Sequence, residues 1–155
     1  MRVLSLWEPW ATLMALRLKK YETRDWAGSR GVTAIHAAKK RFHPADYGPD
    51  LVQQLRDDGI DFKQLAYGCV VCIVDFTRFH RTEVIRASLS KRELAYGNYE
   101  VGRKAWESEF IRKFDDPIPL VGHHGFFGWP EGDKYLAGEP VTRPSHFGPL
   151  FGGSQ

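Results

Sequence analysis

The sequence has no apolar run near the roughly 20 residues that a membrane-spanning helix needs. Its first ten residues, MRVLSLWEPW, hold too short an apolar stretch for a signal peptide, and a glutamate interrupts them early. We therefore expect a soluble, cytoplasmic protein that does not enter a membrane.

Glycine-rich phosphate loops are also lacking, because neither G-x-G-x-x-G nor G-x-x-x-x-G-K-[ST] occurs. ATP-driven enzymes and Rossmann-type dehydrogenases are thereby excluded, and we predict no cofactor. His123 and His124 have no third metal ligand at a suitable spacing, so we predict no metal site either.

Cysteine is scarce, and both copies lie in one Cys-x-x-Cys pattern, Cys69 and Cys72, which superficially matches redox and zinc sites. The surrounding GCVVCIVDF is almost continuously apolar and β-branched, which predicts a buried strand. We interpret the pair as buried thiols that point to opposite faces, because residues three apart in a strand do so.

What the sequence does contain is sufficient for one folded domain. It has 155 residues, of which 43% are hydrophobic and 14% aromatic, enough to close a core. The residue patterns predict strands at 2–6, 21–26, 32–38, 69–76, 104–114 and 125–129, and helices beginning at Pro9, at Pro49 and, after a Thr82-Glu83 cap, over 82–94. Short strands without a repeated βαβ rhythm favour an α+β fold, in which a small mixed or antiparallel β-barrel is flanked by a few helices.

From Pro130 onward the chain is rich in glycine and proline and has little periodicity. We expect a domain over residues 1–130 and a C-terminal extension over 131–155. Tyr135 and Phe147 are the side chains expected to lay this extension over the barrel, and we assign it no function.

Charge is concentrated near the N-terminus. Residues 17–41 hold eight lysines and arginines against two carboxylates, although the whole chain has a net charge of only +3. This asymmetry favours an anionic partner such as nucleic acid or a nucleotide. A basic, solvated face is the alternative.

The stretch LKKYETRDW, residues 18–26, lies inside this basic segment. Strand alternation places Glu22, Arg24 and Trp26 on one face, so that Glu22 and Arg24 are neighbours. The alternative to a functional site is an exposed ion pair within the strand, worth at most about 1 kcal/mol.

The order of these motifs resembles an ASCH domain, a branch of the PUA-like superfamily. LSLWEPWATLM is followed by Lys19-x-x-Glu22-x-Arg24, a tryptophan, Arg-Gly and IHAAKK, while YGNYEVGRKAWESEFIRKFDDPIP and GFFGW are similar to the later strands. The characteristic family stretch is G-x-K-x-x-E-x-R, and Arg17 stands where its glycine is expected. The resemblance covers roughly residues 1–130.

The resemblance implies a small barrel with a cleft that holds Lys19, Glu22 and Arg24, and it implies RNA or modified-base binding. Some small relatives resemble amidohydrolases that act on N4-acylated cytidine, and ribonuclease activity is attributed to others. The amidohydrolases use a threonine nucleophile at the position that is Glu22 here. Thr23 is adjacent but is expected on the opposite face.

Two uses of the cleft remain open, each with Lys19, Glu22 and Arg24 at its centre. In a hydrolase, Glu22 would activate water while a cation stabilises negative charge. In a reader without catalysis, Glu22 would accept hydrogen bonds from a base while the cations hold oxygens. The predicted ligand-binding residues around these three are Trp10, Trp26, Arg30, His36, Lys39 and Tyr99.

Within that set, Trp10, Trp26 and Tyr99 are candidates to stack a base. His36 lies among small apolar residues, so a buried histidine with a structural hydrogen bond is the alternative to an acid or base. Trp7 and Trp106 are predicted core residues, while Ser5 and Ser108 are expected to reach the cleft. A third hypothesis is a protein-interaction module whose basic face meets an acidic protein.

Overall fold

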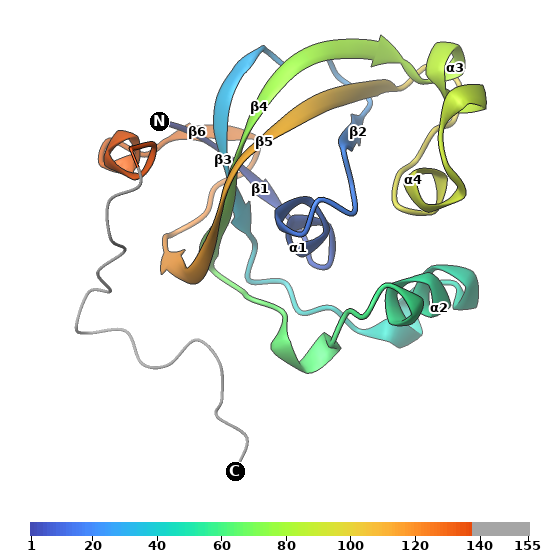
Figure 1. Cartoon of the computed structure of the whole chain (residues 1–155), viewed down its shortest axis with the longest axis horizontal. Coiled ribbons are helices and arrows are strands. Elements are labelled where there is room, and N and C mark those ends of the chain that lie inside the picture. The colour runs from blue at the N-terminus through green and yellow to red at the C-terminus, as the bar shows by residue number, and fades with distance from the viewer. Residues whose placement is uncertain (138–155) are drawn as a thin grey trace.

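The computed structural model describes residues 1–137 (Figure 1). Its strands are β1 (Arg2–Leu6), β2 (Tyr21–Arg24), β3 (Gly31–Ala37), β4 (Cys69–Arg81), β5 (Lys104–Pro119) and β6 (Phe126–Gly128). Its α-helices are α1 (Trp10–Ala15), α2 (Pro49–Asp57), α3 (Thr82–Ile85) and α4 (Lys91–Ala95). Short 3-10 turns are η1 (Pro44–Asp46), η2 (Phe62–Gln64), η3 (Arg86–Ser88) and η4 (Gly132–Tyr135).

The six strands form one mixed sheet in the order β2-β5-β4-β3-β1-β6. β1 runs parallel to β3, and the other neighbouring strands are antiparallel. The long strands β4 and β5 curve together (Figure 1), which curls the sheet into a half-barrel with β2 and β6 at its edges. The predicted α+β fold, a small mixed sheet flanked by a few helices, is confirmed.

Helix α1 packs against one face of this sheet. Its Met14 and Ala15 join buried residues of β1, β3, β4 and β5 in one apolar cluster. Leu13, on another side of α1, packs instead with residues around α2 and with Tyr96. The helix therefore connects the sheet to the outer helices, and the chain leaves it directly into the segment that contains Lys19.

A β-bulge re-orients the middle of β4. The register shifts between Val70 and Cys72, so that Val71 has no partner in the ladder with β3 or β5. Cys69 and Cys72 are fully buried thiols, as predicted, but both belong to the α1-side cluster. The prediction that they point to opposite faces is wrong, because the extra residue breaks the two-residue alternation.

The predicted helix over 82–94 is divided into α3, η3 and α4. Leu89 and Ser90 are extended, and the Ser90 hydroxyl accepts a hydrogen bond from the Glu93 N–H to begin α4. Serine favours such capping over a helix interior because its side chain competes for backbone N–H groups. The strands also differ in length from those predicted: β2 ends at Arg24, whereas β4 and β5 continue to Arg81 and Pro119.

The start of the C-terminal extension packs on the face of the sheet opposite α1. Tyr135 is buried, stacks on Trp129 and contacts the edge of Phe114. Phe147, the other residue expected to hold the extension, lies outside the described residues. Within 1–137, no helix has the length and apolar character needed to cross a membrane.

Arg17 ends α1 in a left-handed conformation with a φ of 58°. The Leu18 N–H donates to the Leu13 carbonyl and the Arg17 N–H to the Met14 carbonyl, which is the Schellman pattern. Glycine is preferred at this position because a side chain disfavours positive φ. A glycine would therefore suit this position, and Arg17 instead contacts the Phe110 ring, whose centroid lies 4.3 Å from its guanidinium carbon.

We predict that Arg17→Gly is more stable than Arg17→Ala by about 1 kcal/mol, because both lose the Phe110 contact but only alanine keeps the left-handed strain. Urea denaturation of the two variants measures this difference directly. Equal stabilities would contradict the left-handed assignment.

Glu8 is buried beside the start of α1. Its carboxylate accepts hydrogen bonds from the Thr12 N–H (3.0 Å) and the Thr12 hydroxyl (2.7 Å). Burial raises the pKa of Glu8 from 4.5 to about 7, although the Thr12 contacts oppose the shift. The folded protein therefore binds this proton more tightly than the unfolded chain does.

Because the folded-state pKa is raised, the stabilising contribution of protonated Glu8 is present below pH 4.5 and is lost as the pH rises through about 7. The free energy of unfolding falls by about 3 kcal/mol over this pH range. We predict that Glu8→Gln, which keeps an acceptor for Thr12, gains stability relative to wild type between pH 5 and pH 8. Thermal melts across this range measure the gain, the exposed Glu131→Gln serves as control, and parallel pH profiles of Glu8→Gln and wild type would refute the prediction.

Candidate functional site

A pocket of about 880 Å³ opens between β1, β2, the segment after α4 and the loop before β6. This volume falls in the range of small-molecule sites. The residues that line it are Ser5, Leu6, Trp7, Trp10, Lys19, Glu22, Thr23, Arg24, Asp25, Trp26, His36, Ala38, Lys39, Ala95, Tyr96, Gly97, Asn98, Arg103, Val121, Gly122, His123, His124 and Gly125.

Lys19 lies in the wall of this pocket with only 3% of its surface exposed. Its ammonium donates a 2.7 Å hydrogen bond to the carbonyl of Tyr96, the residue that caps the C-terminus of α4. Burial lowers the pKa of Lys19, while the charges of Glu22 and Glu93 act in the opposite direction. The site thus contains an ammonium group that loses its proton more readily than a surface lysine does.

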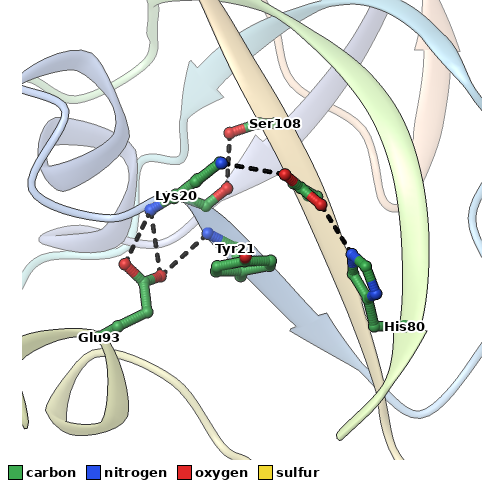
Figure 2. Close-up of polar contacts among 6 residues, drawn as sticks. Lys20, Tyr21, His80, Glu93 and Ser108 are labelled. Carbon is green, nitrogen blue, oxygen red and sulfur yellow. Dashed lines mark hydrogen bonds and ion pairs between the residues drawn. The ribbon is translucent and has the colours of Figure 1, made fainter. Parts of the chain in front are cut away.

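The backbone beside Lys19 is fixed from two elements (Figure 2). The buried Glu93 carboxylate of α4 accepts the N–H groups of Lys20 (3.0 Å) and Tyr21 (2.9 Å). From β5, the Ser108 hydroxyl donates to the Lys20 carbonyl at 2.6 Å. Ser108 therefore supports the site from outside, contrary to the expectation that it reaches the cleft.

The Lys20 side chain points toward β5 (Figure 2) and does not line the pocket. Its ammonium lies 2.9 Å from one carboxylate oxygen of Glu107, and His80 lies 2.7 Å from the other oxygen. Adjacent lysines thus have different environments: Lys19 is buried in the pocket wall, and Lys20 takes part in an exposed ion-pair network.

Glu22 and Arg24 contact each other along β2, as strand alternation predicts. The Arg24 Nε–H donates to the Glu22 carboxylate at 2.8 Å. Glu22 is 7% exposed, and both side chains line the pocket. All three residues at the centre of the predicted cleft, Lys19 included, therefore lie at one pocket.

His36 lies deeper in the same pocket and is 1% exposed. One ring nitrogen, Nδ1, is 2.8 Å from the Ser5 hydroxyl, and the other, Nε2, is 2.8 Å from the Leu120 carbonyl oxygen. Burial lowers the pKa of His36, and the nearby Lys39 and His123 add to the shift. Lys39, at the exposed side, also lines the pocket.

Tryptophans form the apolar part of the wall. Trp10 and Trp26 both line the pocket, and Trp26 also packs edge-on against the buried Trp106 at a centroid distance of 4.7 Å. Trp106 is a core residue as predicted. The core prediction for Trp7 is wrong: it is 53% exposed and lines the pocket, with the Lys40 ammonium 3.4 Å from its ring centroid.

Two of the predicted ligand-binding residues do not line this pocket. Arg30 is exposed on the loop before β3. Tyr99 is buried beyond α4, where its hydroxyl lies 3.5 Å from the Glu93 carboxylate, and burial raises its pKa. Tyr99 thus packs behind the pocket wall.

The sequence patterns missed the residues that distant segments bring to the pocket. Asn98 and Arg103 arrive on the connection between α4 and β5, where the Asn98 N–H donates to the Thr23 hydroxyl and Arg103 donates to the Thr23 carbonyl. His123 and His124 arrive on the loop before β6. No periodicity links these positions to β2, and only the order of strands in the sheet brings them together.

Electrostatically, the pocket lining has more cations than anions. Lys19, Arg24, Lys39 and Arg103 face only two carboxylates, Glu22 and Asp25. Two other cations of the basic segment contact aromatic rings: Lys40 lies over Trp7, and Arg41 lies over Tyr67. Across residues 1–137, no three His, Cys, Asp or Glu side chains gather closely enough to hold a metal ion.

The sequence matches no family model and no curated protein. Among solved structures, the fold is similar to a serine-to-alanine mutant of ZmASCH from Zymomonas mobilis, with 12% identity and a TM-score of 0.52 over 88% of this chain and 92% of that chain. A tyrosine-to-phenylalanine mutant of ZmASCH gives 11% identity and a TM-score of 0.43 over 88% and 94%. At the identity of the first match the likeness concerns the fold alone, and the chain has the fold of an ASCH domain.

Proposed function

We propose that the pocket binds one nucleotide of a single-stranded RNA, or a nucleoside of similar size, with Lys19, Glu22 and Arg24 at its centre. The observation that carries this proposal is that a buried ammonium, of Lys19, and a buried carboxylate, of Glu22, line one pocket of about 880 Å³. Hydrogen-bonding groups in a largely desolvated wall suit recognition of a polar, planar ligand.

The carboxylate supports recognition of a base edge. Glu22 accepts one hydrogen bond from Arg24, and a carboxylate has about four lone-pair positions. The remaining lone-pair positions of Glu22 can accept hydrogen bonds from an exocyclic amine and a ring N–H of a base. The Arg24 contact fixes the direction of this carboxylate before a ligand arrives.

The cations and tryptophans support the other parts of a nucleotide. Lys39 and Arg103 lie in the lining with polar ends suited to phosphate or carbonyl oxygens. Trp7 and Trp26 expose indole surface at the same pocket. Stacking of one base on such a ring contributes about 1–3 kcal/mol.

A second candidate is hydrolysis of RNA or of an N4-acylated cytidine in this pocket. The observation that favours it is the burial of Lys19 in the pocket wall, because burial lowers the pKa of Lys19 and so favours the free amine that a general base requires. A threonine nucleophile is not favoured, because Glu22 stands at the required position. Thr23 lines the same pocket despite its expected place on the opposite face of β2, but its hydroxyl already accepts the Asn98 N–H.

We predict that Lys19→Met lowers the affinity for a short, mixed-sequence single-stranded RNA by about 10- to 100-fold, since hydrogen bonds from charged groups contribute about 1.5–3 kcal/mol. Quenching of tryptophan fluorescence measures the affinity. Lys20→Met is the matched control, because it removes the same charge one residue away and outside the pocket lining. Its affinity should stay within about twofold of wild type.

Binding should also weaken as salt is raised, because phosphate contacts release counterions. Thermal melts first establish that Lys19→Met is folded at the assay temperature. Equal losses in the two lysine variants would contradict a specific role of Lys19, and salt-independent binding would remove the phosphate contacts from the proposal.

For the hydrolytic candidate, we predict turnover of RNA or of N4-acetylcytidine that rises with pH through a Lys19 pKa below 10.5, since the free amine is the base. Chromatography of both products over a pH series measures it. Lys19→Ala should abolish the rise, and Lys20→Ala should keep it. Absence of turnover by wild type on both substrates would leave binding as the function of the pocket.

A further inference from the structure

Ser5 and His36 are direct partners on the parallel strands β1 and β3. The Leu120 carbonyl oxygen can only accept a hydrogen bond, so the 2.8 Å contact places the imidazole proton on Nε2. In the neutral ring Nδ1 is then the acceptor, and the Ser5 hydroxyl, also at 2.8 Å, must donate to it. The backbone carbonyl thereby fixes the tautomer in which a serine proton points at a basic nitrogen.

The pair is held by the local irregularity of the sheet. The bulge in β4 shifts the register between Ile35 and His36, and bulges are a common means of re-aiming a side chain next to a site. A neutral imidazole is favoured because burial lowers the pKa of His36, with Lys39 and His123 adding to the effect and the Leu120 contact opposing it.

The pair also reaches the open space of the pocket. Ser5 is partly exposed, and both residues line the pocket. Gly122 lies directly opposite: a Cβ at this position would overlap the His36 ring and lie 3.0 Å from the Ser5 Oγ. The Gly122 backbone therefore packs directly against the pair, and a side chain at this position would displace the His36 ring.

We propose that Ser5 is a nucleophile and His36 its general base in acyl transfer from carboxylic esters that carry a negative charge. A nucleophile within hydrogen-bond reach of a base, which a third group orients, is the arrangement that such chemistry needs. The anionic preference follows from the cations Lys39, Lys19 and Arg24 in the same lining. This activity goes beyond nucleotide binding and does not require it.

In the first step the Ser5 Oγ attacks the ester carbonyl carbon while its proton moves to His36 Nδ1. The tetrahedral intermediate collapses, the bond to the alkoxide breaks, and His36 returns the proton to the departing alcohol. Water then attacks the acyl-serine with its proton passing to His36. The bond to the Ser5 Oγ then breaks, His36 returns the proton to this oxygen, and the carboxylic acid leaves, so that one ester and one water give one acid and one alcohol.

A fluorophosphonate probe tests the nucleophile directly, since attack by Oγ forms a phosphorus–oxygen bond and expels fluoride. Peptide mapping of the full chain by mass spectrometry should find the adduct on Ser5. Ser5→Ala should lose it, and His36→Gln should form it at least 100-fold more slowly, as expected for loss of a general base. Ser88→Ala, which removes an exposed hydroxyl outside the pocket lining, should react as wild type.

Hydrolysis of 4-acetoxybenzoate and of neutral phenyl acetate tests the substrate class. Wild type should show a higher kcat/KM for the anionic ester, and Ser5→Ala should hydrolyse neither. No adduct on Ser5 in folded wild type, or equally fast labelling of His36→Gln, would overturn the proposal, and equal kcat/KM values would overturn its anionic part. RNA binding by Ser5→Ala is measured in parallel, so that failure here is separable from failure of nucleotide binding.

Discussion

Burial of the Lys19 ammonium is the constraint on which the pocket depends. Removing such a charge from water costs several kcal/mol unless partners replace the lost hydration. Here the Tyr96 carbonyl accepts a hydrogen bond from the ammonium, and the charges of Glu22 and Glu93 stabilise the ammonium form. The carbonyl belongs to the end of a helix, where intrahelical partners run out. Electrostatic interactions, and not apolar packing alone, therefore hold helix α4 and strand β2 together.

The turn before Lys19 makes this burial possible. The left-handed Arg17 reverses the chain after α1, and Lys19 follows while its own N–H still reaches the Leu13 carbonyl. Glu93 then fixes the next two backbone N–H groups. Since α1 is itself anchored in the sheet cluster through Met14, the position of Lys19 follows from core packing on one side and from α4 on the other.

These relations explain how far the sequence could predict the molecule. Local patterns suffice for β1, for the buried strand around Cys72 and for the contact between Glu22 and Arg24, because each depends on residues close in sequence. The bulge at Val71 could not be predicted, since it arises from pairing with β3 and β5 at once. The core prediction for Trp7 is wrong because its apolar character predicts burial, whereas its position at the pocket mouth depends on the fold.

The site residues also differ in how far the sequence could predict them. Lys19, Glu22 and Arg24 share one short segment, so motif spacing could identify them. Ser5 and His36 are 31 residues apart, and their relation depends on parallel pairing of β1 with β3.

The charged residues on the β2 side and the Ser5 and His36 pair have different chemistry within one pocket. The β2 side holds a charged pair and a buried ammonium, which suit recognition of a polar ligand. The β1 and β3 side holds a neutral hydroxyl and imidazole whose proton positions are set by a carbonyl. Since a carboxylate beside His36 would favour its protonated form, a backbone carbonyl is the partner that fixes the ring while adding no full charge. The binding groups and the candidate reacting pair thus lie on different strands of the sheet, and both line the same pocket.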